Sequence, residues 1–250
     1  MSTGDLKRLK DANESEFQQT LVLFSDIWGV GGETAKKWYA MGHRTLEDLR
    51  KTPSLLNAQQ KIGLKHYESF KQRIPREEVY LLGEVVRSAL ARVDRNLQME
   101  ICGSYRRGAA TCGDIDILIS NKKGEELDSV LEETLNILHK EGFLTDDLSR
   151  GGKNSSKYMG VCCLPPPTGS GLHRRIDLQT IPLDEWPCAL LYFTGTLLAS
   201  LTSDVSCLSH THFLSYTHSQ HTNAHTLSPF LSPPASFSLN PNDQHLLFLQ

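Results

Sequence analysis

Two acidic residues, Asp114 and Asp116, lie two positions apart in a segment whose alternating pattern predicts a β-strand over residues 114–119. Residues i and i+2 of a strand point to the same face, so both carboxylates project together while Ile115 and Ile117 pack behind them. Adjacent carboxylates repel each other unless a cation lies between them, and Mg²⁺ and Mn²⁺ prefer carboxylate oxygen. The spacing therefore predicts a divalent-metal site. The alternative is a solvated strand end with two acids of no function, which the apolar residues 117–119 disfavour.

A third acid follows in a second segment of the same alternating type, Arg174-Arg175-Ile176-Asp177-Leu178. Its pattern predicts a strand over residues 175–181 that neighbours the first one. Three carboxylates on adjacent strands can hold two divalent ions about 3.5–4 Å apart, an arrangement used for in-line displacement at phosphorus. Asp177 is therefore the expected third ligand.

The segment Gly103-Ser104-Tyr105-Arg106-Arg107-Gly108 precedes the two acids and follows a strand expected over residues 98–102. We expect it to open a helix, where exposed N–H groups, a serine hydroxyl and an arginine together suit a triphosphate. Gly29-Val30-Gly31 lies farther upstream between two helical segments, and by itself predicts only a tight turn. Lys36 and Lys37 after it suit either a DNA phosphate or a solvated helix face.

Several segments together resemble the family X DNA polymerases, in the branch of the beta and lambda types. The longest is residues 102–116, in which Gly-Ser at positions 103–104 differs from the Gly-Gly of the terminal-transferase and mu branch. Residues 73–78, residues 173–177 and Tyr192-Phe193-Thr194-Gly195 match further elements of the family, and residues 141–148 resemble the lambda type. The resemblance covers about residues 5–196.

This resemblance implies an α+β fold and a role for each matching residue. A helix-hairpin-helix subdomain precedes a nucleotidyltransferase palm with a mixed β-sheet. The catalytic and metal-binding residues are Asp114, Asp116 and Asp177, which hold two Mg²⁺ or Mn²⁺ ions. The nucleotide-binding residues are Arg73, Gly103, Ser104, Arg107 and Gly113, with Tyr192 and Phe193 under the incoming sugar. The hairpin residues are Ser25, Ile27, Gly29, Val30 and Gly31, whose backbone grips a DNA phosphate and whose carbonyls at 25, 27 and 30 hold a monovalent cation.

The implied function is that of a DNA-directed DNA polymerase that fills gaps during DNA repair in the nucleus. It transfers a nucleotide from a dNTP to the 3′-hydroxyl of a primer. Its expected partners are gapped or nicked duplex DNA, bound through phosphates without sequence preference, together with a dNTP and proteins of repair complexes. We expect a monomer that does not bind membranes.

Two departures from the family leave a second hypothesis open. The chain starts near the end of the family's small lyase domain, so its Schiff-base lysine has no match here and we expect no lyase activity; the BRCT module has no match either. After Gly195 the sequence diverges, where relatives continue into a basic helix and a subdomain that clamp the nascent base pair. The alternative is therefore a catalytically impaired DNA-binding fragment.

The chain divides into three parts: a helical DNA-binding subdomain over residues 1–72, a palm over residues 73–196, and a tail over residues 197–250. Helices are expected over residues 7–27, 32–39, 60–72, 77–93 and 127–140, and Pro75 is expected to close the helix over residues 60–72. Strands are expected over residues 98–102, 114–119, 158–164 and 175–181. The tail contains ten Ser, five Thr and six His, a composition that predicts disorder. Metal chelation by His210, His212 and their neighbours is the alternative.

Composition narrows the class of protein further. The chain has 250 residues, a net charge of −3 and 39 % hydrophobic residues, which excludes collagen-like and coiled-coil chains. Its apolar runs fall far short of the ~20 residues that a membrane span needs. All 26 Lys and Arg lie within residues 1–175, so any phosphate-binding surface belongs there. The six cysteines contain no C-x-x-C pair, and we expect them to be mostly small buried hydrophobic residues.

Overall fold

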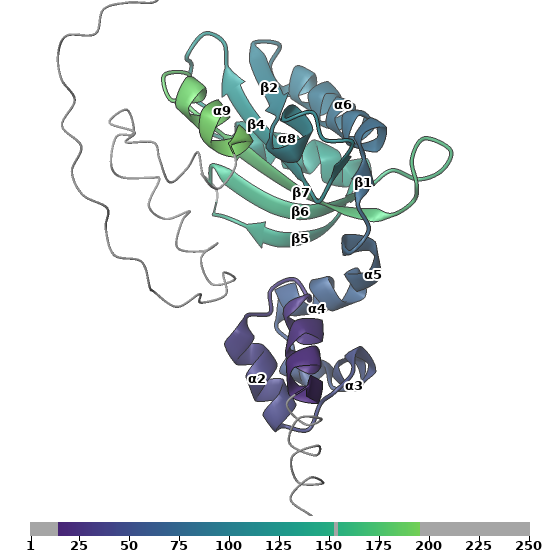
Figure 1. Cartoon of the computed structure of the whole chain (residues 1–250). Helices are drawn as coiled ribbons and strands as arrows, with labels where there is room; N and C mark the ends of the chain where they lie inside the picture. The colour runs from purple at the N-terminus through teal and green to yellow at the C-terminus, as the bar shows by residue number, and fades with distance from the viewer. Residues whose placement is uncertain (1–14, 153–154, 196–250) are drawn as a thin grey trace, which may run out of the picture.

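Residues 15–152 and 155–195 are described by the structure, a computed structural model of the chain. They form a helical unit followed by an α+β unit, stacked one below the other in Figure 1. The disorder and the metal chelation expected for residues 197–250 concern residues outside those described. None of the helices in the described part is long and apolar enough to cross a membrane.

The helical unit consists of short helices around its own core. Residues 15–25 are helical, and the further helices are α2 (Gly32–Ala40), α3 (Leu46–Lys51), the 3-10 helix η1 (Pro53–Leu55), α4 (Ala58–Lys65) and α5 (Tyr67–Phe70). Ala35 and Trp38 lie on the buried face of α2, as their helical spacing predicts, and pack against Phe24 and Leu49. Two capping boxes, at Thr45 and Asn57, define the starts of α3 and α4.

The α+β unit is built on a mixed sheet. Its elements are β1 (Ile74–Pro75), α6 (Arg76–Val93), β2 (Leu97–Ile101), α7 (Gly103–Arg106), β3 (Thr111–Cys112), β4 (Ile115–Asn121), α8 (Val130–Lys140), β5 (Leu144–Arg150), β6 (Lys157–Cys163), β7 (His173–Thr180) and α9 (Trp186–Thr194). Five strands pair in the order β2-β4-β7-β6-β5, and β1 pairs with β3 in a separate ribbon. Only β4 and β7 run parallel to each other; the other neighbours are antiparallel.

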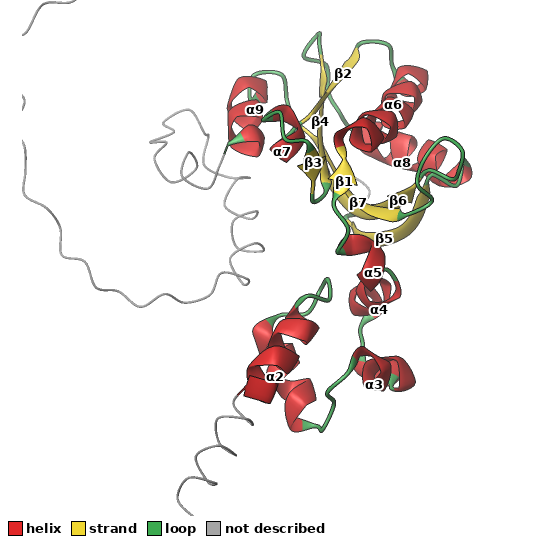
Figure 2. Ribbon diagram, turned by 45° about the vertical axis from the view of Figure 1, so that its right-hand side comes forward, coloured by secondary structure: helices red, strands yellow, loops and turns green. Residues whose placement is uncertain are grey.

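Side chains along β4 alternate between the two faces of this sheet, and their packing partners identify each face. Ile115, Ile117 and Ile119 belong to the core that α6 and α8 cover. Leu118 belongs to a smaller cluster with residues of α9 on the opposite face, and Figure 2 shows α7 and α9 on that side. Because successive strand residues alternate between faces, Asp116 shares this side with Leu118. The polar residues of interest therefore lie on the thinly covered face of the sheet.

Three expectations from the sequence need correction. The helix expected over residues 60–72 is split at His66 into α4 and α5, because the His66 side chain contacts Asp146 of the α+β unit. Pro75 does not close that helix; it pairs with Thr111 in the β1–β3 ribbon and precedes α6. The helix expected from residue 127 begins at Val130, after Ser129 adopts a positive φ of 65°.

Two elements, β5 and α9, were not predicted as a strand and a helix. The β5 sequence contains two adjacent aspartates and no clean alternation, and its burial pattern is correspondingly irregular. The expected burial of the cysteines is confirmed for Cys102, Cys112 and Cys162, whereas Cys163 and Cys188 are half-buried. Cys207 lies outside the described residues.

The turn at residues 26–30 is held directly against α4. A Cβ at Gly63 would lie 2.4 Å from the carbonyl oxygen of Trp28, so only glycine permits this contact. The Gln60 side-chain amide donates a hydrogen bond of 3.0 Å to the carbonyl of Gly29. Turn and helix α4 therefore move as one body.

We predict that Gly63→Ala lowers the free energy of unfolding of the helical unit by about 1–3 kcal/mol, because the backbone of Trp28 must shift. The measurement is urea unfolding followed by tryptophan fluorescence. The matched control is Gly32→Ala at the start of α2, where an added Cβ meets nothing within 4 Å and stability stays equal or rises by up to about 1 kcal/mol. Equal stability of the two variants would contradict the close contact.

Candidate active site

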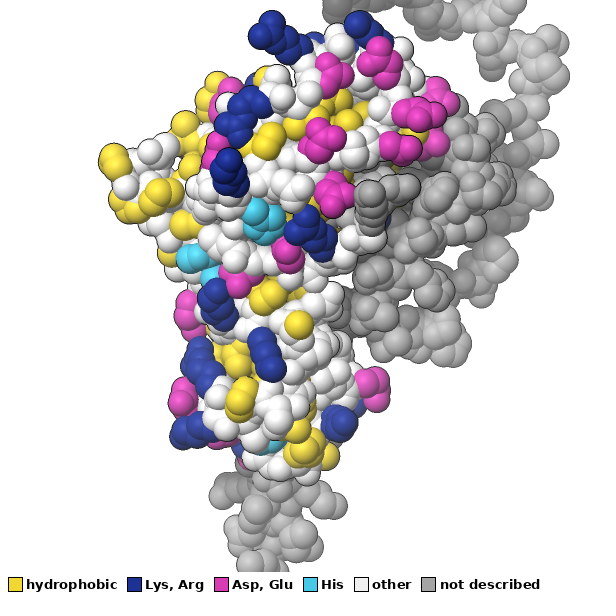
Figure 3. Space-filling view, turned by 180° about the vertical axis from the view of Figure 1, so that it is seen from behind, with side chains coloured by type: hydrophobic (Ala, Val, Ile, Leu, Met, Phe, Trp, Pro, Cys, Tyr) yellow, Lys and Arg dark blue, Asp and Glu magenta, His cyan; other side chains and the backbone are white. Residues whose placement is uncertain are grey.

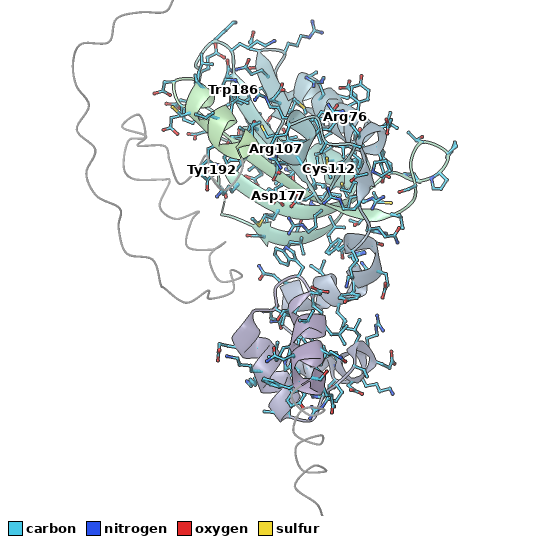
Figure 4. All side chains as sticks on the ribbon, viewed as in Figure 1. Arg76, Arg107, Cys112, Asp177, Trp186 and Tyr192 are labelled. Carbon is cyan, nitrogen blue, oxygen red and sulfur yellow. The ribbon has the colours of Figure 1, made fainter. Side chains whose placement is uncertain are left out.

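The three aspartates predicted from the sequence meet where β4 and β7 run side by side. Their parallel register places Asp116 opposite Asp177, and Asp114 lies just before β4. One carboxylate oxygen of each residue lies within 4.8 Å of those of the other two. Figure 4 shows Asp177 on the sheet and Arg107 close by in the same view. Strand pairing, rather than a flexible loop, thus sets the distances among these carboxylates.

Burial and the charges of neighbouring carboxylates make Asp116 and Asp177 unusually weak acids. The pKa of Asp116 is raised to about 7, first by burial and then by the charges of Asp114 and Asp177. The pKa of Asp177 is raised to about 6 by burial and by Asp114, although Arg175 opposes the shift. A site that holds this much negative charge at short distance is stabilised by bound cations.

Two cationic side chains beside the carboxylates were not singled out from the sequence. Arg175 pairs with Asp114, and its Nη2 atom lies 3.9 Å from Asp177 Oδ2. Lys157 of β6 lines a narrow pocket with Asp116, Asp177 and Phe193, and burial lowers its pKa to about 8. Arg175 could have been found, because it lies two residues before Asp177 on one strand. Lys157 could not, because only the pairing of β6 with β7 brings it near.

The donor set fits divalent cations of the Mg²⁺ or Mn²⁺ type. It consists of carboxylate oxygens alone, it is only partly shielded from solvent, and no cysteine or histidine within the described residues joins the group. Arg175 and Lys157 together supply at most two positive charges to three carboxylates, so a negative excess remains when all three are ionised. The chain therefore holds a compact carboxylate group compatible with divalent-metal binding.

The loop expected to bind phosphate packs against this group. Gly103 has a positive φ of 56°, and a Cβ there would lie 2.3 Å from Asp116 Oδ2. The amide of Cys102 donates a hydrogen bond of 2.8 Å to the carbonyl of Asp116. Glycine at position 103 thus allows the start of α7 to lie directly against β4.

The other residues expected around a nucleotide are placed near this loop. Arg73 Nη2 donates to the Thr111 carbonyl at 2.6 Å, which puts its guanidinium within reach of exposed Gly113, the neighbour of Asp114. Ser104 lies in α7 and Arg107 is the residue that ends it. The structure therefore brings together the loop, Arg73 and the carboxylates from three separate elements.

Tyr192 and Phe193 lie in the last turn of α9, with ring centroids 5.2 Å apart. Arginines of the phosphate loop connect this turn to α7: Arg106 Nη1 donates to Thr194 Oγ1 at 3.2 Å, and Arg107 Nη1 donates to the Thr194 carbonyl at 2.9 Å. The aromatic pair is thereby held on the same face of the sheet as the carboxylates.

The hairpin residues Ser25, Ile27, Gly29, Val30 and Gly31 form a separate group in the helical unit. The amide of Val30 donates to the carbonyl of Ile27 at 3.0 Å, and Gly31 ends the turn as the N-cap of α2. An added Cβ at Gly31 would meet nothing within 4 Å. The backbone at Gly31 is therefore accessible to a ligand from outside.

A hollow of about 770 Å³ lies apart from the carboxylate group. It lies between the loop after β4 and the loop before α9, and it is lined by acidic residues that include Glu125, Glu126, Asp128, Glu132 and Asp184. Figure 3 shows acidic side chains gathered on the back of the α+β unit. This hollow is therefore separate from the site formed by the three carboxylates.

Comparison with known proteins agrees with this arrangement. Two family models match adjoining parts of the chain: the fingers domain of DNA polymerase lambda over residues 22–71 and the DNA polymerase beta palm over residues 73–183. DNA polymerase lambda of Rattus norvegicus is 45 % identical over 199 residues, which are 78 % of this chain and 34 % of that protein.

More distant relatives align over the same share of this chain. DNA polymerase lambda of Arabidopsis thaliana is 38 % identical over 202 residues, and DNA-directed DNA/RNA polymerase mu of Homo sapiens is 30 % identical over 220 residues. The alignments cover 78 % of this chain, but 37 % and 44 % of those relatives. This chain thus spans between a third and a half of the length of the curated relatives it matches.

The part that matches the fingers is followed directly by the part that matches the palm, and the three aspartates lie in the latter. The chain belongs to the family X DNA polymerases of the beta and lambda branch.

Proposed function

We propose that this chain transfers a nucleotide from a dNTP to the 3′-hydroxyl of a DNA primer at a gap or nick, as a repair polymerase. The observation that carries this proposal is the group of three carboxylates within 4.8 Å, built on two paired strands. The phosphate loop at Gly103 lies against the same group. No other cluster of carboxylate, cysteine and histidine ligands occurs within the described residues.

Asp114 and Asp116 would each hold two divalent ions, Mg²⁺ or Mn²⁺, and Asp177 would hold the one nearer to the primer. Bound there, such ions neutralise the charge that develops on the transferred phosphoryl group and activate the attacking hydroxyl. Asp177 would accept a hydrogen bond from that hydroxyl; its position opposite Asp116 supports this role. Its raised pKa is consistent with a role in taking up the proton.

Arg73, Gly103, Ser104, Arg107 and Gly113 would hold the triphosphate. The arginines contribute charge-assisted hydrogen bonds, and the glycines permit the close approach of the backbone. Tyr192 and Phe193 would support the sugar from the adjacent turn of α9. In this arrangement the protein mainly positions the reacting groups, which alone can contribute several orders of magnitude to rate.

The hairpin of Ser25, Ile27, Gly29, Val30 and Gly31 would bind a phosphate of the duplex through backbone N–H groups, with a monovalent cation on the carbonyls of Ser25, Ile27 and Val30. Contacts of this kind fix the register of the duplex without reading its sequence. Lys36 and Lys37 follow in α2 and add positive charge. We propose that residues 1–72 act as the DNA-binding subdomain and residues 73–196 as the catalytic palm, in a monomer located in the nucleus and recruited by repair proteins.

A second function, duplex binding without turnover, is favoured by one observation. Residues 176–250 contain no Lys or Arg, so they offer no cationic side chain to the template or to the triphosphate. Primer extension on a one-nucleotide gap with Mg²⁺ or Mn²⁺ separates the two functions, because only the first produces a longer primer.

We predict that Asp177→Asn abolishes primer extension and leaves the dissociation constant for gapped duplex within about twofold. The amide removes a metal ligand, whereas duplex binding depends on phosphate contacts elsewhere. Single-turnover extension and fluorescence anisotropy measure the two quantities. Asp184→Asn, outside the carboxylate group, is the control and extends primers like the parent. Extension by Asp177→Asn at the parental rate would show that the third ligand is wrongly assigned.

We predict that Gly31→Val weakens duplex binding roughly tenfold without loss of stability. No atom of the described residues lies within 4 Å of an added Cβ, so the steric effect of the substitution falls on the approaching DNA backbone. Parental affinity should be independent of sequence and should fall with salt, because the contacts are to phosphate. Anisotropy titrations at several salt concentrations test this, with thermal unfolding as the control for folding. Unchanged affinity of the variant across the salt series argues against DNA binding by the hairpin.

A further inference from the structure

The helical unit meets the α+β unit through a small polar cluster. On one side are Lys65 at the end of α4 and His66, which follows it; on the other are Asp146 of β5 and His173 of β7. Lys65 Nζ donates to Asp146 Oδ1 at 2.8 Å, and His66 Nε2 lies 2.7 Å from Asp146 Oδ2. The imidazoles of His66 and His173 stack with centroids 4.3 Å apart. We call Lys65, His66, Asp146 and His173 the Asp146 junction.

The centre of the Asp146 junction is shielded from water, whereas the Lys65 side chain at its edge is 59 % exposed. The side chain of His66 is 5 % exposed and that of Asp146 is 15 % exposed. Burial by itself raises the pKa of Asp146, but hydrogen bonds with Lys65 and His66 outweigh it and the pKa is lowered. Asp146 is therefore an anion at neutral pH that binds two groups of the helical unit at once. In Figure 3, histidine side chains appear at the level where the two units meet.

Helix α4 links this junction to the hairpin. Gln60 and Gly63 of α4 contact the backbone of Gly29 and Trp28. Gln59, next to Gln60, donates a hydrogen bond of 2.7 Å to the carbonyl of Leu148 in β5. Helix α4 thus binds the hairpin through Gln60 and the sheet through Gln59.

The sheet continues the connection from Asp146 to the carboxylate group. Asp146 pairs with Val161 of β6, and Met159, two residues before Val161, pairs with Asp177 of β7. Backbone hydrogen bonds between strands fix these positions. The hairpin and Asp177 are therefore joined through α4, the Asp146 junction and three paired strands.

We propose that Asp146 is a positioning residue, which holds the hairpin at a fixed place relative to Asp114, Asp116 and Asp177 so that a duplex bound by the hairpin presents its primer end to the carboxylates. The inference rests on the proposed function, because it assigns the junction a task in that reaction. Without the junction, the chain would still bind duplex and metal, but the position of the duplex relative to the metal would no longer be fixed.

The first experiment tests the junction itself by hydrogen exchange and mass spectrometry of the full chain. Asp146→Asn should accelerate amide exchange in α4, α5 and β5 roughly tenfold and leave β2 and β4 unchanged. The matched control is Glu141→Gln, which removes an ion pair with Arg92 inside the α+β unit. Asp146→Glu keeps the carboxylate and should restore slow exchange. Equal exchange in Asp146→Asn and the parent would overturn the proposal.

The second experiment tests placement without requiring nucleotide transfer. Fe²⁺ is bound in place of Mg²⁺ and treated with ascorbate and hydrogen peroxide, which produces hydroxyl radicals at the carboxylate group and cuts nearby DNA. The parent should cut a labelled gapped duplex at one narrow position. Asp146→Asn should spread the cuts over several nucleotides, while its affinities for duplex and for Mn²⁺ stay within about twofold of the parent.

Each outcome has a distinct meaning. A narrow pattern in both proteins overturns the positioning role. Absence of cutting by the parent counts against the metal or DNA site of the proposed function, and the exchange experiment then still decides whether Asp146 joins the two units. Equal spreading in Glu141→Gln would show that loss of any surface carboxylate suffices, which also overturns the assignment.

The junction should also weaken as pH falls below neutral. Burial and the neighbouring His66 lower the pKa of His173 from its ordinary value of 6.5. The charged groups that face it are Lys65, His66 and Asp146, and its strand partner is Cys163. Because the folded state favours neutral His173, this stabilisation is complete above pH 6.5 and is lost as pH falls below that value.

We predict that exchange in α4 and β5, corrected for intrinsic rates, increases between pH 7.5 and pH 5.5 in the parent. Asp146 remains charged over this range, since its pKa lies below 3.8. His173→Phe keeps an aromatic ring against His66 and removes the titrating group, so its increase should be smaller. Identical pH dependence of the two proteins would exclude His173 as the group that responds.

Discussion

Everything described for the palm depends on the parallel pairing of β4 with β7. That pairing places Asp116 opposite Asp177 and forces three carboxylates into one small volume. Repulsion and burial there oppose ionisation, as the raised pKa values of Asp116 and Asp177 show. The apolar face of the same strands, packed under α6 and α8, supplies the burial energy that keeps the carboxylates together. A cation relieves the repulsion, so the fold favours cation binding at this point.

The two faces of the sheet differ in polarity and in how completely helices cover them. The face under α6 and α8 forms the main hydrophobic core. Within the described part of the chain, the other face is covered by α7 and α9 alone, and their packing leaves Arg107, Tyr192 and the carboxylates partly exposed. Arg106 and Arg107 connect the two short elements through Thr194. This division lets polar residues line one side of a stable sheet; among the described residues, only the buried hydroxyl of Ser120 in β4 is left without a hydrogen-bond partner.

The helical unit has a core of its own and is joined to the palm by polar contacts. A polar connection of this kind fixes orientation through the geometry of hydrogen bonds, whereas apolar contacts are less directional. Burial and His66 lower the pKa of His173 in this connection, so its neutral form is favoured in the folded state. The hairpin and the sheet that carries the carboxylates are thereby connected through α4, whose side chains bind the carbonyls of Gly29 and Leu148.

The sequence by itself determined the local features: the strand that begins directly after Asp114 and carries Asp116, the turn of Gly103, the amphipathic α6 and the family to which the chain belongs. These follow from side-chain alternation, turn residues and motif spacing, which depend only on neighbouring positions. Tertiary structure alone decided the split of a helix at His66, the irregular strand β5, the approach of Lys157 to Asp177, and the pairing of Arg175 with Asp114. In each of these, a partner distant in the chain supplies the deciding contact: Asp146 lies 80 residues from His66. Local periodicity carries no information about such partners, because sheet order and the docking of the two units place them.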